Sequence, residues 1–345
     1  MSSLIAWLGL GRRANLAKCL CDSDSGDSIT IVEKAEVIRS QVEDAKSQTA
    51  QKLVQSIIAT HMELLELPHF RPGKTIDELL GNLVSLCCQI HDQEIVRQVH
   101  ENAGMQAILP SLRQICAEAE SCLEAHWADR IVNGGVGSSP DDVFERLKSF
   151  PYYENYVDLT RLELCAMYSV TNSHPHKVAF IGSGPLPLTS LCMLDELKNS
   201  PMSLKGLSHC SDRIQPVILN MDYDEVAIAA SLSLSLKLGA RGQGMEFVCA
   251  EAGSDHQSLS EFDVVYVAAL VGMSQADKED ILVKVANKMK RGALVVIRSS
   301  WGLRTCLYPE VDMTTDRLLQ RLEPCVVVHP YGQVVNSVIV ARVKP

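Results

Sequence analysis

The chain has 345 residues, of which 46% are hydrophobic and 21% charged, and this composition excludes disordered, fibrous and collagen-like proteins. Its formal net charge is −10, and because an acidic surface repels phosphate backbones, we expect no nucleic-acid partner. No apolar run approaches the roughly 18–20 residues of a membrane span, so we expect no membrane partner. At roughly 100–200 residues per domain, the length favours two domains.

The cysteines favour a reducing compartment. Twelve are scattered along the chain, and no pair has the CxxC spacing of a zinc or redox site. Several lie within apolar segments, as Cys116, Cys165 and Cys249 do, where a free thiol behaves as a small hydrophobe. We therefore expect a cytoplasmic protein. Residues 1–21 carry basic residues and no acid, so an organelle-targeting segment is the alternative to a frayed tail.

The first half of the sequence has helical periodicity. Apolar residues recur at three- and four-residue steps, which predicts helices over Ile31–Leu67, Thr75–Ile90 and Gln93–Asn102. The clearest apolar stripe follows Pro110, and because proline is tolerated in a first turn, we expect a helix to begin there. We expect a partly helical extension over residues 1–50 and an all-α helical-bundle domain over residues 51–172.

The second half, residues 173–345, alternates short β-branched runs with helical stretches. Strands are predicted over Lys177–Ile181, Pro216–Met221, Met245–Cys249, Asp263–Ala268, Ala293–Arg298 and Val334–Ala341. Helices are predicted between or after them, over Leu188–Lys198, Glu225–Leu238, Lys278–Lys290 and Thr314–Leu322. This alternation is typical of a doubly wound α/β domain with a mostly parallel sheet.

Small and acidic residues follow the first three predicted strands. The first strand runs into Gly182-Ser183-Gly184-Pro185, a turn that lets a ligand approach the backbone closely. The second strand ends at Asp222, where a carboxylate can accept ribose hydroxyls, and Glu251 follows the third. Because the carboxyl ends of parallel strands meet at one edge, these residues indicate a ligand crevice.

The composition of this turn restricts the ligand. Pro187 stands where GxGxxG requires its third glycine, and there is no GxxxxGK[ST] phosphate loop. The turn also lacks basic residues, which suits a ligand without phosphates, such as S-adenosylmethionine. The alternative is a glycine-tight turn in a domain that binds something else.

From about Leu53 to Val343 the sequence resembles nicotianamine synthases. The stretches that carry the resemblance are DELLGNLVSL (77–86), CAEAESCLEAH (116–126), SFPYYENYVDL (149–159), VAFIGSGPLPLTS (178–190), DVVYVAALVGM (263–273), IRSSWGLRTCLYP (297–309) and VNSVIVAR (335–342). The combination of GSGPLPLTS with AALVGM is far more specific than a glycine turn alone.

The resemblance implies a helical domain followed by a Rossmann-like S-adenosylmethionine-binding domain. It implies an aminocarboxypropyltransferase that condenses three molecules of S-adenosylmethionine into nicotianamine and releases three of methylthioadenosine. S-adenosylmethionine is then a substrate, and neither a prosthetic group nor a metal takes part. The product chelates iron, nickel, copper and zinc.

The resemblance also implies two catalytic residues. The attacking amine must lose a proton, and a carboxylate whose pKa is raised by partial burial can accept it. The family's catalytic glutamate maps onto Glu120, and its catalytic tyrosine onto Tyr156. From the residues alone, the interpretation of Glu120 as a boundary acid that reaches solvent is favoured, and the motif match reverses that preference. Tyr152 and Tyr153 either contact the adenosine or form an aromatic hinge.

The remaining expected site residues bind the nucleotide and the substrate carboxylates. The nucleotide set is Gly182, Ser183, Gly184, Pro185, Asp222, Glu251 and Ala269. Arg298 and Arg304 match carboxylate geometry, although a structural pair with a buried acid is the alternative. His174 and His176 lack a third ligand and do not predict a metal site.

The sequence departs from the family pattern at two of these places. Glu251 stands where aspartate is more usual, and Ala117 replaces the leading glycine of the motif around Glu120. An S-adenosylmethionine-dependent methyltransferase on the same fold is the alternative function, because a fold does not determine which carbon is attacked. A non-catalytic nucleotide-binding or scaffold protein is the second alternative. The oligomeric state stays open.

Overall fold

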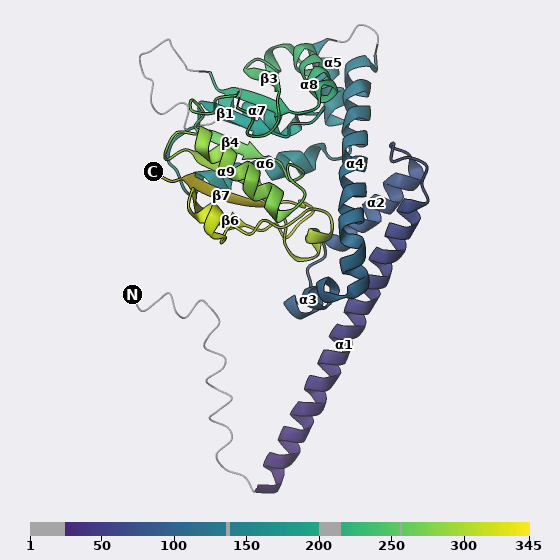
Figure 1. The fold of residues 1–345 in the computed structure, drawn as a ribbon. Coiled ribbons are helices and arrows are strands. Elements are labelled where there is room, and N and C mark those ends of the chain that lie inside the picture. Colours follow the sequence, from purple (N-terminus) through teal and green to yellow (C-terminus); the bar gives the residue numbers. More distant parts are fainter. Residues whose placement is uncertain (1–24, 136–138, 200–214, 256) are drawn as a thin grey trace.

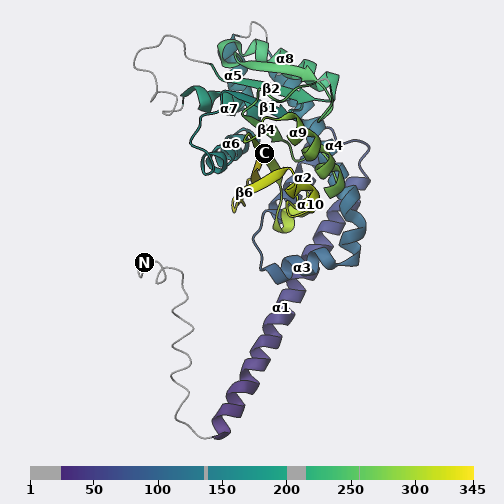
Figure 2. The ribbon, with the colours of Figure 1, turned by 60° about the vertical axis from the view of Figure 1, so that its left-hand side comes forward.

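The computed structural model describes residues 25–135, 139–199, 215–255 and 257–345. Its first half is helical, with α1 Ser25–Leu65, α2 Lys74–Cys87, α3 Gln93–Glu101, α4 Ala103–Asn133, α5 Pro140–Lys148 and α6 Tyr153–Tyr168. The N-terminal part of α1 projects away from the rest of the protein in both views (Figures 1 and 2). The possible targeting segment, residues 1–21, lies outside the described residues.

Helix α4 begins earlier than Pro110, so the predicted start is wrong. Asn102 caps the helix: its side-chain oxygen accepts hydrogen bonds from the N–H groups of Gly104 (2.9 Å) and Met105 (3.2 Å). This cap satisfies two of the free N–H groups of the first turn. Pro110 therefore lies inside the helix. The resulting 31-residue helix runs along the side of the α/β part (Figure 1).

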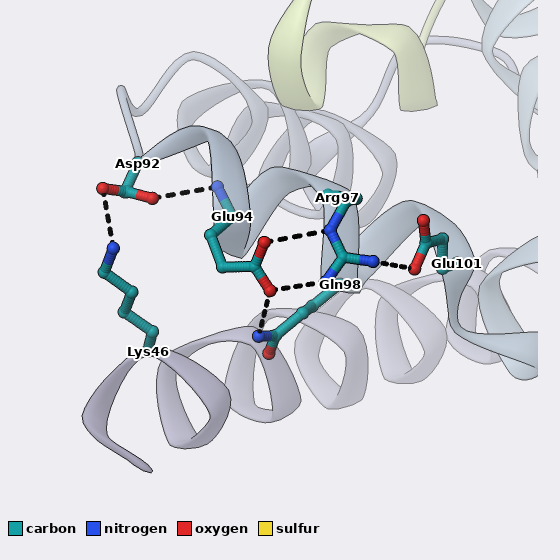
Figure 3. A network of polar contacts seen from close by, with 6 residues as sticks. All are labelled: Lys46, Asp92, Glu94, Arg97, Gln98 and Glu101. Atoms are coloured by element: carbon teal, nitrogen blue, oxygen red, sulfur yellow. Dashed lines mark hydrogen bonds and ion pairs between the residues drawn. The ribbon is translucent and has the colours of Figure 1, made fainter. Parts of the chain in front are cut away.

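Helix α3 is fastened to α1 by a polar network (Figure 3). Lys46 of α1 donates to Asp92 (2.9 Å), whose other oxygen accepts from the N–H of Glu94 and caps α3. Within α3, Arg97 bridges Glu94 and Glu101. Contact with Arg97 lowers the pKa of Glu94 to about 2. Because these side chains are mostly exposed, the network orients α3 more than it stabilises the fold.

The second half forms one seven-stranded sheet in the order β3-β2-β1-β4-β5-β7-β6. The strands are β1 Lys177–Ile181, β2 Val217–Asp222, β3 Met245–Cys249, β4 Val264–Val267, β5 Leu294–Ser299, β6 Leu322–Val328 and β7 Ser337–Val343. All neighbours from β3 to β5 pair in parallel, and β7 is antiparallel to both β5 and β6. This confirms the α/β fold with a mostly parallel sheet.

Helices cover both faces of the sheet. On one face α7 (Leu188–Asn199) and α6 pack against strand residues such as Val178 and Phe180. On the other face α9 (Gln275–Lys288) and α10 (Asp316–Leu319) pack against Ala179 and Val265. Helix α8 (Glu225–Lys237) contacts β2, β3 and α4. Burial on both faces explains the continuous apolar runs of β1, β4 and β5.

The helix predicted over Thr314–Leu322 is mostly wrong. Only Asp316–Leu319 is helical, and Leu322 begins β6, a strand that the periodicity did not indicate. β6 lies at the edge of the sheet and contains Pro324, which has no N–H to donate to a neighbour. Because its residues are largely exposed, the apolar signal of a buried strand is missing.

Side chains from both sides of the predicted domain boundary, between residues 172 and 173, pack together in the same hydrophobic clusters. Helix α6 packs on the sheet, although it precedes that boundary. In the other direction, Leu303, Cys306 and Leu307, which follow β5, are buried in the core of the helical part beside Leu83 and Leu112. A site at this junction is therefore held from both sides. No helix in the described ranges combines the length and the apolar character needed to cross a membrane.

Candidate active site

The glycine turn after β1 is fixed to the end of β2. The N–H groups of Gly182 and Ser183 both donate to the carbonyl of Met221, at 2.8 and 3.1 Å. The N–H of Gly184 donates to Oδ2 of Asp222 at 2.9 Å. The other oxygen of Asp222 accepts from the N–H of Asp224, so this carboxylate orders two turns at the edge of the sheet.

Both glycines of the turn are required by its shape. Gly182 and Gly184 have φ values of +80° and +65°, in the region that side chains rarely adopt. A Cβ on Gly182 would lie 2.3 Å from Val271, and one on Gly184 would lie 2.6 Å from Oε2 of Glu124. The second contact brings α4 directly against the turn.

A cavity of about 630 Å³ opens above this turn. Every residue of the expected nucleotide set lines it: Gly182, Ser183, Gly184, Pro185, Asp222, Glu251 and Ala269. Its volume falls within the range of small-molecule and cofactor sites. The predicted strand ends are thus brought together as one concave surface.

A second, smaller cavity of about 350 Å³ lies beside the first and is lined by residues of α2, α4 and the segment 150–159. It is lined largely by apolar side chains, among them Ile76, Leu80 and Leu159. The two cavities share five lining residues: Glu120, Glu124, Tyr156, Arg298 and Asn336. We call these five residues the shared wall.

In the shared wall, Glu124 is hydrogen-bonded to Tyr156. The hydroxyl of Tyr156 donates to Oε1 of Glu124 at 2.7 Å. Burial and the neighbouring charge of Glu120 raise the pKa of Glu124 to about 8, although the Tyr156 hydrogen bond and Arg298 oppose that shift. The raised pKa favours the protonated form of Glu124 near neutral pH.

The other acid of the shared wall, Glu120, is hydrogen-bonded to Tyr308. The hydroxyl of Tyr308 donates to Oε2 of Glu120 at 2.7 Å, and Tyr308 reaches the wall from the segment after β5. Burial raises the pKa of Glu120, while this hydrogen bond and Arg298 lower it. The two acids lie one helical turn apart, so each disfavours ionisation of the other.

The two arginines occupy different environments. Arg298 is buried in the shared wall, where its Nε donates to Glu163 (2.7 Å) and its Nη2 to Thr189 (2.6 Å). Arg304 lines neither cavity, because its guanidinium donates to the backbone carbonyls of Cys88, Gly332 and Val334. The two arginines are not brought together, and Arg304 braces the loop before β7.

A buried lysine holds the turn after β4. Nζ of Lys278 on α9 donates to the carbonyls of Ala268 (2.9 Å) and Ala269 (2.8 Å), both of which line the larger cavity. Burial lowers the pKa of Lys278 to about 7. Lys278 thereby fixes the backbone at the start of the AALVGM segment, residues 268–273.

Three members of the site were not predicted from the sequence: Glu124, Tyr308 and Asn336. Glu124 had a signal, since it follows Glu120 by one turn in the same helix. The other two come from distant segments and had no such signal.

The tyrosines predicted beside Tyr156 lie in different places: Tyr152 lines the smaller cavity, whereas Tyr153 packs in an apolar cluster. His174 bonds to the hydroxyl of Tyr168 and the carbonyl of Leu197.

Comparison with known proteins identifies relatives over most of the chain. A family model described as nicotianamine synthase protein matches residues 45–345. Nicotianamine synthase 2 of Oryza sativa subsp. japonica is 34% identical over 304 residues, covering 87% of this chain and 85% of that protein. Nicotianamine synthase 2 of Arabidopsis thaliana is 32% identical over 291 residues, covering 84% and 83%.

Solved structures show the same fold. A glutamate-to-glutamine mutant of MtNAS in complex with S-adenosylmethionine superposes with a TM-score of 0.66 at 19% identity, covering 85% of this chain and 98% of that chain. MtNAS in complex with MTA and tNA gives a TM-score of 0.65 at 19% identity, covering 86% and 98%. The arrangement of helical part and sheet is therefore shared with these proteins.

Glu120 raises the pKa of Glu124 and Tyr156 lowers it, so removing each should shift that pKa in opposite directions. Glu120→Gln should lower the pKa of Glu124 below about 8, because the neighbouring charge is removed. Tyr156→Phe should raise it, because the carboxylate loses a hydrogen-bond donor. NMR titration of labelled glutamate carboxyls measures both. Glu118→Gln, an exposed acid of the same helix, should leave the pKa unchanged. Shifts of both variants in one direction would contradict the pairing.

Proposed function

The chain belongs to the nicotianamine synthase family, and from that membership we propose that it is a transferase making nicotianamine. It condenses three molecules of S-adenosylmethionine by 3-amino-3-carboxypropyl transfer and releases three of methylthioadenosine. The observation that carries the proposal is the family match over residues 45–345, which spans both cavities and the shared wall.

Each transfer makes one C–N bond and breaks one C–S bond. The lone pair of an amine attacks the carbon next to sulfur on the amino-acid side of S-adenosylmethionine. The C–S electrons return to the positively charged sulfur, which leaves as the neutral thioether methylthioadenosine. The amine proton passes to a base, and an internal attack of the same kind closes the azetidine ring. The protein must therefore supply one competent base and a fixed donor carbon.

We assign the base to Glu120 within the pair that it forms with Glu124. The family's catalytic glutamate maps onto Glu120, which supports Glu120 as the member that ionises, and its charge is one cause of the raised pKa of Glu124. With the proton of the pair on Glu124, Glu120 is free to accept the proton of the amine. Tyr308 orients the Glu120 carboxylate, and Tyr156 bridges Glu124 to the reacting groups.

The donor nucleotide is assigned to the larger cavity. Gly182, Gly184 and Pro185 give close backbone approach, and Asp222 and Glu251 face the ribose and adenine side. Ser183 and Ala269 complete the lining. The acceptor amine and the growing product are assigned to the smaller cavity, where burial between transfers favours retention over release. Arg298 holds a substrate carboxylate from the wall between them.

The product suggests a cellular role. Nicotianamine carries several amines and carboxylates, and we propose that it serves the chelation and homeostasis of iron, zinc, copper and nickel. The nine cysteines of the described ranges are free thiols, which supports a cytoplasmic location. The net charge of −10 continues to disfavour nucleic acid as a partner.

The proposal predicts products from one substrate alone. Purified protein incubated with S-adenosylmethionine should give methylthioadenosine and nicotianamine in a ratio near 3:1, because each C–N bond releases one nucleoside. Mass spectrometry of the quenched mixture measures both products. Release of S-adenosylhomocysteine would indicate methyl transfer instead and refute the proposal. Free intermediates containing one or two transferred units would refute retention in the smaller cavity.

Asp222→Ala should weaken binding of S-adenosylmethionine by about 10–100-fold, because hydrogen bonds to a charged group contribute about 1.5–3 kcal/mol. The variant also frees the N–H of Gly184. Isothermal titration calorimetry measures the affinity. Glu261→Gln is the matched control, since Glu261 pairs with Lys177 at the opposite end of β1. Unchanged affinity in the Asp222 variant would remove this residue from the site.

A further inference from the structure

The shared wall contains an amide without a partner. Nδ2 of Asn336 is buried, and in the described part of the chain it makes no hydrogen bond. The residue is 8% exposed and lies just before β7. Buried amide groups are almost always paired, because an unpaired donor loses its hydration without compensation. A ligand that enters the cavities would supply the missing acceptor.

Two further unpartnered groups line the larger cavity. The hydroxyls of Ser183 and Ser190 are buried and have no hydrogen-bond partner among the described residues. Their exposed fractions are 7% and 1%. The cavity is therefore built for a polar ligand that satisfies several groups at once, and Asn336 is the one that also faces the smaller cavity.

Arg298 supplies a positive charge at the same wall. Its Nε and Nη2 are engaged by Glu163 and Thr189, and neither bond uses Nη1. The ion pair with Glu163 holds the guanidinium in one orientation. Because Arg298 and Asn336 line the same two cavities, their N–H groups can donate to one carboxylate, and the bond from the guanidinium is charge-assisted.

Charge complementarity selects the ligand group. The wall places the acids Glu120 and Glu124 beside these donors, so it presents both signs of charge within one surface. The amino-acid end of S-adenosylmethionine also carries both signs, an ammonium and a carboxylate. The glycine turn and the shared wall line the same cavity, so a donor with its nucleoside at the turn can reach the wall with that end.

We propose that Asn336, together with Arg298, binds the carboxylate of the S-adenosylmethionine arm that is transferred. This inference rests on the proposed function and names the group that fixes the donor. Anchoring the carboxylate turns the carbon next to sulfur, rather than the methyl group, toward the acceptor amine. Asn336 is thus a specificity-determining residue for aminocarboxypropyl transfer.

The test compares ligands with and without the carboxylate. Asn336→Leu should weaken binding of S-adenosylmethionine by about tenfold or more. Its affinity for methylthioadenosine, which lacks the arm, should change by less than about twofold, since the nucleoside contacts remain. The preference of the parent protein for S-adenosylmethionine over its decarboxylated analogue should shrink by the same factor as the affinity. Calorimetry measures all three ligands, and methylthioadenosine binding reports that the variant is folded.

A second variant tests which group Asn336 faces. Asn336→Asp keeps the shape and replaces the donor with a negative charge, so it should weaken S-adenosylmethionine binding more than Asn336→Leu does. Tighter binding in the aspartate variant would mean that residue 336 faces the ammonium, and would overturn the inference. Equal losses for S-adenosylmethionine and methylthioadenosine, or no loss, would also overturn it. Failure of the parent protein to bind S-adenosylmethionine would instead contradict the proposed function itself.

Discussion

Two carboxylates held one turn apart on α4 set the constraint on which the rest of the site depends. Glu120 and Glu124 are each bonded to a tyrosine, and both lie near the single guanidinium of Arg298. In such a place two negative charges disfavour each other, so the pair favours holding one proton and a single negative charge. A site that must deprotonate an amine three times thereby keeps one carboxylate ionised and a neighbour able to hold a proton.

The constraint explains why the helical and sheet parts interlock. Helix α4 supplies the acids, α6 supplies Tyr156 and the counter-ion Glu163, and the segment after β5 supplies Tyr308. The glycine turn approaches so closely that a Cβ at Gly184 would lie 2.6 Å from Oε2 of Glu124. Neither part alone would contain the shared wall, which suits a reaction between a donor in one cavity and an acceptor in the other.

Features of the fold and the site that depend on neighbouring residues were predictable from the sequence, whereas contacts between residues far apart in the chain were not. The glycine turn, Asp222, Glu251 and the mostly parallel sheet needed only local patterns and the rule that parallel strands end at one edge. Tyr308 and Glu120 are 188 residues apart, and Arg298 and Glu163 are 135 apart, so periodicity carries no information about them. Residue type alone was also misleading for Arg304. An arginine suggested a binding site for a substrate carboxylate, but its guanidinium donates to backbone carbonyls.

The assignment of the base is tested most directly by comparing Glu120→Gln with Glu124→Gln in single-turnover experiments at pH 7, with saturating S-adenosylmethionine. The Glu120 variant should lose about 10²–10⁴-fold in the rate of methylthioadenosine formation, because its acceptor for the amine proton is gone. The Glu124 variant should lose less than about tenfold, since glutamine resembles the protonated acid present at that pH. The opposite ranking would contradict the account and make Glu124 the base.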